Sequence, residues 1–296
     1  MTGMGEPRTI NVGGHTTRYY DSGSGFPVVF IYGGNFGARD SASSATTWEP
    51  CFALSDSYRL IAFDKVGQGY TDNPLNDDYT MAAVTRHAIA FVEAMGLVRV
   101  HLVGHSRGGY TAVRMAMERP DLVRSLTVIN SGTLSPGVST NDVALARPPH
   151  PSLSREAARW LYRNYVFDPA VVTEAWVEAA YAVMSQPKYQ ESVRKMWDEQ
   201  YATTTFFPNL GREKRETLTW IAEGRLQRPT QIFWGLNDRT ATMERAIELR
   251  DLLAAHERQC PFHVFAQCGH FPFQEHPQAF NGLLDRFIAA VDARRR

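Results

Sequence analysis

Short apolar runs, rich in β-branched and aromatic residues, recur along the chain. Continuous apolar runs of this length are typical of strands that are buried on both faces of a parallel sheet. Strict alternation of apolar and polar residues would instead indicate a sheet with one face in water. The runs lie at residues 28–32, 59–64, 98–103, 125–129, 230–234 and 262–265.

Helical patterns lie between these runs. Residues 80–95 form one, and Gly96 follows it as a helix C-cap. Residues 110–118, 243–255 and 277–290 form others. The start of the chain, residues 8–23, instead predicts a β-hairpin. Strands that alternate with helices favour an α/β fold, here a mostly parallel eight-stranded sheet flanked by helices and joined by right-handed crossovers.

Residues 134–223 break this alternation. They contain helical stretches near 154–166, 170–184 and 189–199 and no convincing strand. We therefore expect a core domain made of residues 1–133 and 224–296. We expect residues 134–223 to form a helical cap, or lid, over the carboxyl edge of the sheet, inserted after the sixth strand.

Aromatic residues are concentrated within the expected cap. Twelve of them lie in positions 151–223, among them Trp160, Trp176, Trp197 and Trp220. An ordinary helical core would account for part of this enrichment. The rest fits a wall for an apolar or aromatic ligand, because small-molecule pockets are lined mainly by such side chains.

Composition narrows the classes of function. The 296 residues carry 31 basic and 31 acidic side chains with no basic stripe, which argues against a nucleic-acid partner. Three scattered cysteines predict neither a disulfide framework nor a zinc site. No apolar run is long enough to span a membrane, and the first residues lack the apolar segment of a secretory signal. We expect a soluble cytoplasmic protein that acts on a small molecule; whether it forms a homo-oligomer stays open.

The hexapeptide Gly104-His105-Ser106-Arg107-Gly108-Gly109 is the most informative motif. It follows an apolar run and precedes a helical pattern, which is the context in which G-x-S-x-G forms a nucleophile elbow. Gly104 and Gly108 lack the Cβ atoms that would clash on so tight a turn, and the turn would expose the Ser106 hydroxyl. A glycine-rich turn with an incidental serine is the alternative, which the later motifs disfavour.

A serine hydroxyl needs a base within hydrogen-bond reach, and the base needs an orienting group. Asp238 follows the fifth apolar run, and no carboxylate follows the fourth run, where Asn130 stands. His270 directly follows the last run. The chain order Ser106, Asp238, His270 is one of the known orders of a nucleophile, its acid and its base.

An oxyanion hole would complete the site. One donor is the backbone N–H of Arg107, at the positive end of its helix. We assign the second donor to Gly34 in Tyr32-Gly33-Gly34-Asn35, because glycine lets an amide approach a substrate closely. A phosphate-binding loop is the alternative, but no Gly-Lys-Ser/Thr follows it. No histidine pair has helical metal-binding spacing, so we expect no metal and no cofactor.

These motifs together resemble the α/β-hydrolase superfamily over nearly the whole chain. More narrowly, the chain is similar to the meta-cleavage product hydrolases, which cleave carbon–carbon bonds in ring-opened dienoates from aromatic catabolism. The narrower resemblance rests on the residues 31–38, 62–74, 104–109, 234–239 and 267–270. It implies that Ser106, Asp238 and His270 carry the triad roles. For the substrate pocket we assign Asn35, His105, Phe271 and Trp176.

Four positions depart from that family's pattern. Tyr32 and His105 stand where the family usually has His and Asn, and Phe271 stands where Trp is common. His105 would either tune a proton transfer or only pack. Ala180 aligns with a lid arginine that grips the dienoate carboxylate, and the loss of that charge-assisted contact favours a less charged ligand.

Another lid arginine would offset this loss if it reached the pocket; Arg155, Arg159 and Arg163 are the candidates. We therefore expect a serine hydrolase that acts on a carbonyl-containing, aromatic or ring-derived small molecule, as C–C bond hydrolases do. A carboxylesterase or lactonase is the alternative. A ligand-binding receptor or non-hydrolytic helper on the same scaffold is the alternative from another class.

Overall fold

The computed structural model describes residues 3–137, 145, 148–256 and 260–293. Within them, eight strands form one sheet in the order β1-β2-β4-β3-β5-β6-β7-β8. β1 and β2 form the predicted hairpin and β2 also pairs antiparallel with β4, whereas the other neighbours are parallel. The predicted α/β fold is confirmed. The strands are β1 (Arg8–Val12), β2 (His15–Ser22), β3 (Pro27–Ile31), β4 (Arg59–Phe63), β5 (Val100–His105), β6 (Val123–Ile129), β7 (Thr230–Gly235) and β8 (Phe262–Phe265).

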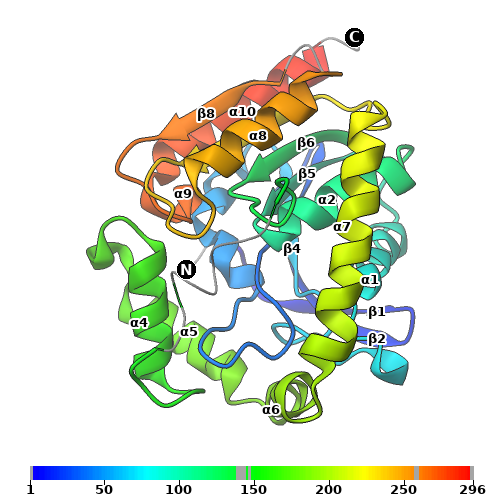
Figure 1. The fold of residues 1–296 in the computed structure, drawn as a ribbon. Helices are drawn as coiled ribbons and strands as arrows, with labels where there is room; N and C mark the ends of the chain where they lie inside the picture. The colour runs from blue at the N-terminus through cyan, green and yellow to red at the C-terminus, as the bar shows by residue number, and fades with distance from the viewer. Residues whose placement is uncertain (1–2, 138–144, 146–147, 257–259, 294–296) are drawn as a thin grey trace.

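Helices cover both faces of the sheet (Figure 1). On one face, apolar side chains of α1, α2, α7 and α8 form a core with alternate residues of β3 such as Val29 and Ile31. On the other face, Val28 and Phe30 join a second core with α4, α5, α9, α10 and the 3-10 helix Ala45–Leu54. The helices are α1 (Met81–Ala94), α2 (Arg107–Glu118), α4 (Arg155–Tyr165), α5 (Glu174–Met184), α6 (Pro187–Val193), α7 (Phe207–Ala222), α8 (Met243–Ala254), α9 (Pro272–Glu275) and α10 (Pro277–Ala293).

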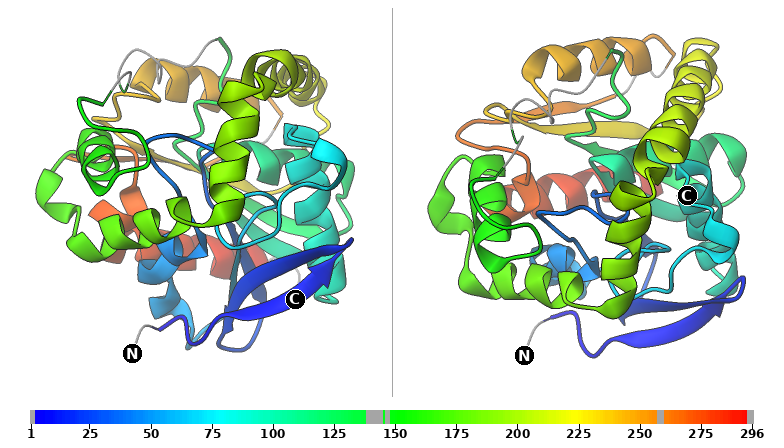
Figure 2. Two further views of the ribbon diagram at one scale, coloured as in Figure 1. Left: turned by 90° about the horizontal axis from the view of Figure 1, so that it is seen from below. Right: turned by 60° about the horizontal axis from the view of Figure 1, so that its bottom comes forward.

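The chain between β6 and β7 contains α4, α5, α6 and α7. Figures 1 and 2 show α4, α5 and α6 gathered at one end of the molecule, while α7 runs back alongside the core. α7 contacts α1 and α8. The predicted helical stretch 170–184 consists of a short 3-10 turn (Pro169–Val171) and α5. α5 begins after Thr173 because the Thr173 side chain caps the helix by accepting a hydrogen bond from the Trp176 N–H.

Several elements were not predicted from the apolar pattern, among them α7 and the 3-10 helix Ala45–Leu54. α7 buries only Thr217 and Ile221 along its length, so its sequence lacks a strong apolar stripe. The 3-10 helix Ala45–Leu54 contains Pro50, which disfavours a regular helix. The boundaries of β5 also differ from the prediction, since Arg99 has a positive φ of 56° and the strand begins only at Val100. No helix of the described residues is both long and apolar enough to cross a membrane.

The crossing of β5 and α2 leaves no room for side chains at two glycines. A Cβ at Gly104 would lie 2.4 Å from the carbonyl oxygen of Gly108, and a Cβ at Gly108 would lie 2.0 Å from that of Ile31. Both contacts involve backbone atoms, which cannot swing aside as a flexible side chain does. The G-x-S-x-G pattern is therefore a packing requirement of this turn.

We predict that Gly108→Ala lowers the free energy of unfolding by about 3 kcal/mol, because the added methyl group forces the helix away from β3. Chemical denaturation would measure this change. Gly211→Ala is the matched control: Gly211 lies in α7 with nothing within 4 Å of its added Cβ. The control should gain about 0.5–1 kcal/mol, since alanine favours a helix over glycine. Equal stabilities for the two variants would contradict the packing argument.

Candidate active site

Ser106 lies on the turn between β5 and α2 in strained backbone geometry. Its φ and ψ are 53° and −122°, a conformation that few residues other than glycine adopt. The turn is fixed from two sides: the Ser106 N–H donates to the Ile129 oxygen at 2.8 Å, and the Ser131 hydroxyl donates to the Ser106 oxygen at 2.6 Å. Ser106 itself is half-buried, while the strand before it is buried. The hydroxyl is thus held at a partly accessible point.

His270 and Asp238 meet at the carboxyl edge of the sheet. The His270 Nδ1–H donates to Asp238 Oδ2 at 2.5 Å, across 32 residues of sequence. The Asp238 side chain is fully buried, and that of His270 is 5% exposed. A proton on Nδ1 leaves Nε2 of the neutral ring as an acceptor, which is the tautomer that a general base requires.

Asp238 is surrounded by hydrogen-bond donors. Oδ1 accepts from the Thr240 N–H and hydroxyl, each at 2.8 Å, and from the Ala241 N–H at 3.0 Å. Oδ2 also accepts from Asn130 Nδ2 at 2.7 Å. Burial alone would raise the pKa of the Asp238 carboxyl, but the charge of His270 and the hydrogen bonds from His270, Ala241 and Thr240 outweigh burial and lower the pKa. The carboxylate therefore stays ionised and stabilises a charged imidazole.

The loop that carries His270 is anchored to the chain around it. The His270 N–H donates to the Tyr165 oxygen at 2.8 Å, and the Tyr165 ring stacks on the imidazole with 4.9 Å between centroids. Glu275 accepts from the N–H groups of Gly269 and Phe271 at 2.9 and 3.1 Å. Glu275 also accepts from the N–H of Phe167 at 2.7 Å, which ties the loop to the chain after α4. These bonds fix the direction in which the imidazole points.

His105 is buried beside the catalytic candidates. Its Nε2 lies 2.8 Å from the backbone oxygen of His270, and because a carbonyl only accepts, the ring carries its proton on Nε2. Burial, with the nearby charge of His270, holds the pKa of His105 well below its ordinary value. The ring packs at 4.6 Å from His270 and 4.9 Å from Phe271. A neutral, packed His105 supports the loop; contact with a substrate stays a prediction.

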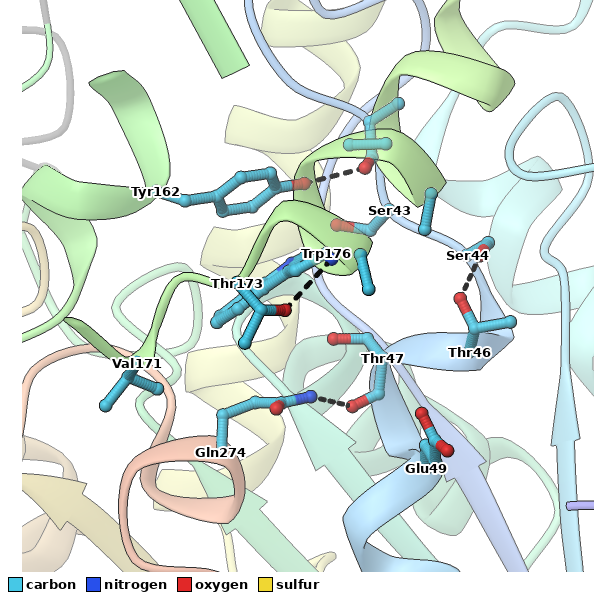
Figure 3. Close-up of a pocket in the computed structure, with 14 residues that line it drawn as sticks. Ser43, Ser44, Thr46, Thr47, Glu49, Tyr162, Val171, Thr173, Trp176 and Gln274 are labelled. Atoms are coloured by element: carbon cyan, nitrogen blue, oxygen red, sulfur yellow. Dashed lines mark hydrogen bonds between the residues drawn. The ribbon is translucent and has the colours of Figure 1, made fainter. Parts of the chain in front are cut away.

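Aromatic side chains connect this loop to a cavity of about 170 Å³. Phe271 contacts Trp176 at 5.2 Å and Tyr162 at 6.2 Å between ring centroids, and both of the latter line the cavity. Figure 3 shows Trp176 and Tyr162 facing Ser43, Thr47 and Gln274 across it. Three of the four residues assigned to the substrate pocket, His105, Phe271 and Trp176, thus lie in one continuous aromatic cluster.

The cavity wall is held in place by hydrogen bonds to backbone oxygens. The Tyr162 hydroxyl donates to the Ala42 oxygen at 2.7 Å, and Gln274 Nε2 donates to that of Thr47 at 2.6 Å (Figure 3). Ala180 also lines the cavity, as does Glu49, the one acidic or basic residue among the described lining residues. The cavity is small compared with typical ligand sites of 300–1,000 Å³, so it suits one ring or a short chain.

The loop after β3 packs against Ser106. A Cβ at Gly33 would lie 2.7 Å from that of Ser106, so only glycine fits. Gly34 has a φ of 86° and is exposed, with no atom closer than 3.6 Å to an added Cβ. The Asn35 side chain is occupied locally, accepting from the Phe36 N–H at 2.9 Å. Gly34 is thus an exposed residue on a loop that packs against Ser106.

Sequence reasoning missed the groups that position the candidates. The sequence pattern predicts no role for Asn130; its position after β6, beside β7, is a signal that points to Asp238. Glu275 lies five residues after His270, but nothing in the local sequence indicates that it turns back to the loop. Tyr165 carries no local signal, because its contact depends on how α4 packs. No group of three or more His, Cys, Asp or Glu side chains that could hold a metal occurs among the described residues.

Known proteins resemble this chain over nearly its full length. A family model described as the alpha/beta hydrolase fold matches residues 27–277. A 2-hydroxymuconate semialdehyde hydrolase of Pseudomonas sp. (strain CF600) is 29% identical over 287 residues, which cover 97% of this chain and 95% of that protein. A 2-hydroxy-6-oxononadienedioate/2-hydroxy-6-oxononatrienedioate hydrolase of Klebsiella pneumoniae is 28% identical over 292 residues, 95% of each protein.

A solved structure agrees with these relatives. The meta-cleavage product hydrolase CumD of Pseudomonas fluorescens IP01 superimposes with a TM-score of 0.77 at 28% identity. The match covers 97% of this chain and 98% of that chain. The resemblance to meta-cleavage product hydrolases that the motifs indicated is confirmed, and with it the expectation of an enzyme of the hydrolase class.

We predict that Asp238→Asn lowers the reactivity of Ser106 on the order of 10⁴-fold, because an amide NH₂ at this position favours the wrong tautomer of His270. The rate of Ser106 labelling by a fluorophosphonate would measure the loss, with circular dichroism to check folding. Asp251→Asn, on the outer face of α8, is the control and should label like the wild type. A near-neutral Asp238→Asn would exclude Asp238 as the orienting acid.

Proposed function

This chain belongs to the alpha/beta hydrolase fold family, and we propose that it is a serine hydrolase with Ser106 as nucleophile, His270 as base and Asp238 as acid. The observation that carries the proposal is the 2.5 Å hydrogen bond between His270 Nδ1 and the buried Asp238 carboxylate, at the sheet edge that bears the strained Ser106. Packing alone does not require a buried carboxylate at this place, since burying a charge is costly. A catalytic role explains it.

The geometry supports a two-step reaction. Ser106 Oγ attacks a substrate carbonyl while His270 takes its proton, and Asp238 stabilises the imidazolium that forms. His270 then protonates the leaving group, and water releases the acyl group from Ser106 by the same route. The N–H groups of Gly34 and Arg107 would bind the oxyanion, the latter at the N-terminal end of α2, where the helix dipole is positive.

The names of the relatives favour a C–C bond hydrolase of ring-fission products as the reaction class. In that version the leaving group is a carbanion, so a proton must first reach a substrate carbon to produce a ketone that accepts electrons. In an ester or lactone version the leaving group is an alkoxide and needs no such step. We propose the C–C class for the scaffold, with an aromatic or ring-derived substrate, and keep the ester or lactone version as the alternative.

The charged side chains around the cavity favour a substrate whose part inside the cavity is uncharged. Ala180 lines it, and Glu49 would repel an anion. The arginines that could compensate are paired elsewhere: Arg155 with Glu178, and Arg159 with Glu174. Arg163 lines a different hollow, together with Arg159 and Arg239. We propose that the cavity selects against a carboxylate.

We propose that the segment between β6 and β7 acts as a cap on this site. Residues 134–223 were expected to form it. Its α4 and α5 line the cavity through Tyr162 and Trp176, and the chain after α4 holds the His270 loop. α7 lies against α1 and α8 and would serve the core. The functional cap would therefore be the part that precedes α7.

We predict that Ser106→Ala lowers turnover of an aryl ester by about a thousandfold or more, since only binding and oxyanion stabilisation would remain. The variant loses one hydroxyl and should stay folded. Ser185→Ala, at the exposed end of α5, is the control and should keep wild-type turnover. A fluorophosphonate that labels Ser106 would separate a hydrolase from a ligand-binding receptor on the same fold. A folded Ser106→Ala variant with more than about a tenth of the activity would contradict the triad.

We predict that neutral aryl esters, lactones or ketones outperform carboxylated dienoates by about tenfold to a hundredfold in kcat/KM, the value of one charge-assisted hydrogen bond. Ala180→Arg should raise dienoate turnover and leave the neutral substrates unchanged or slower. Ala180→Met, which adds bulk without charge, is the matched control. Efficient cleavage of a dienoate by the wild type, abolished by Arg163→Met, would overturn this selectivity.

A further inference from the structure

Lys65 is a buried lysine behind the loop that carries Gly34. Its side chain is 1% exposed overall, and its Nζ donates to the Gly33 backbone oxygen at 2.8 Å. The ammonium also lies 4.5 Å from the centre of the Tyr32 ring, and the Lys65 N–H donates to the Tyr32 hydroxyl at 3.3 Å. Burying a lysine is unfavourable unless its amino group is hydrogen-bonded or paired with an opposite charge. The position of Lys65 behind this loop therefore requires an explanation.

The Gly33 carbonyl and the Gly34 N–H belong to one peptide group. That peptide is trans, so the carbonyl and the N–H point in opposite directions. A bond that draws the Gly33 oxygen toward Lys65, inside the protein, turns the Gly34 N–H outward. Gly33 is packed against Ser106 and is buried, whereas Gly34 is exposed. The outward direction is therefore the accessible side of the loop next to the nucleophile.

Two adjacent glycines make this peptide easy to turn. Glycine adopts positive and negative φ about equally well, and Gly34 already has a φ of 86°. Rotation of the peptide by half a turn would aim a carbonyl, instead of an N–H, at the accessible side. An oxyanion site with a carbonyl in it repels the charge that it must bind. A hydrogen bond to the Gly33 carbonyl would oppose this rotation.

The charges around Lys65 are arranged for this bond and not for an ion pair. The neighbouring Asp64 is engaged by Arg18 at 2.7 Å and by the N–H groups of Ala45 and Tyr70. Burial, together with the positive charge of Arg107, holds the pKa of Lys65 well below its ordinary value, against a smaller opposite effect of Asp64. Both the ammonium and the neutral amine carry N–H donors, so the bond to Gly33 persists in either form.

We propose that Lys65 is a positioning residue that locks the Gly33–Gly34 peptide with the Gly34 N–H facing the oxyanion of the reaction. The inference deepens the proposed hydrolase function and rests on it. It also gives a physical role to Tyr32, whose ring lies against the Lys65 amino group and whose hydroxyl accepts from the Lys65 backbone N–H. Lys65 acts through Gly34 and does not itself contact the reacting atoms.

Lys65→Met tests the proposal, because methionine keeps an unbranched apolar chain and removes the donor. We expect kcat for an aryl ester to fall about tenfold to a hundredfold with KM within about twofold, somewhat less than the loss of a whole oxyanion donor. An arylboronic acid, whose adduct with Ser106 imitates the tetrahedral intermediate, should bind more weakly by the same factor. Binding of the intact ester to the Ser106→Ala background should not change.

Lys188→Met is the matched control. Lys188 is another partly buried lysine whose Nζ donates to a backbone oxygen, that of Thr71 in the loop after β4, at 2.6 Å. Its replacement should lower the melting temperature without changing kcat or boronate affinity. If Lys65→Met does not fold, Lys65→Gln against Lys188→Gln gives the same comparison, and the shorter amide should still weaken boronate binding several-fold.

The outcomes separate the two proposals. A wild type that hydrolyses esters and is labelled at Ser106, with kcat and boronate affinity unchanged in folded Lys65→Met, overturns the role of Lys65 and leaves the hydrolase function intact. A change in KM alone, or equal effects in the Lys65 and Lys188 variants, overturns it as well. A wild type that neither turns over esters nor reacts with the fluorophosphonate overturns both proposals.

Discussion

The buried carboxylate of Asp238 is the group on which the arrangement of the site depends. An ionised carboxylate is costly to remove from water unless its oxygens are hydrogen-bonded. Its donors come from the segments after three neighbouring strands: Asn130 after β6, Thr240 and Ala241 after β7, and His270 after β8. These donors meet only if the three strands end at one edge in the observed order. The requirement of one side chain thus constrains the topology of this half of the sheet.

Low polarity around the imidazole strengthens the same interaction. The rings of His105, Tyr165 and Phe271 surround His270 at 4.6, 4.9 and 5.3 Å. Attraction between opposite charges grows as water is excluded, so the imidazolium formed during a reaction would be held by Asp238 more firmly than at an exposed site. Because His105 is neutral, it adds packing without adding a competing charge.

The sequence indicated those parts of the molecule that depend on local patterns. Ser106, Asp238 and His270 could be singled out as candidates because each lies in the turn or loop that follows a strand, and the ends of parallel strands meet at one edge. α7 could not be predicted because it buries two side chains along its whole length. The contacts of Tyr165, Glu275 and Lys65 could not be predicted either, since they connect segments whose relative placement depends on packing and leaves no periodic signal.

The hydrogen bond from the His270 N–H to the Tyr165 oxygen joins the core of the molecule to the segment between β6 and β7. Because the acceptor is a backbone atom, the constraint falls on the path of the main chain and not on the identity of a side chain. This segment is therefore not an interchangeable module. During evolution, the side chains of α5 that face the cavity are free to diversify, whereas an insertion or deletion near residues 165–167 would displace His270. Changes of ligand preference in this lineage should thus accumulate as side-chain substitutions in the segment between β6 and β7, while the path of its main chain stays nearly the same.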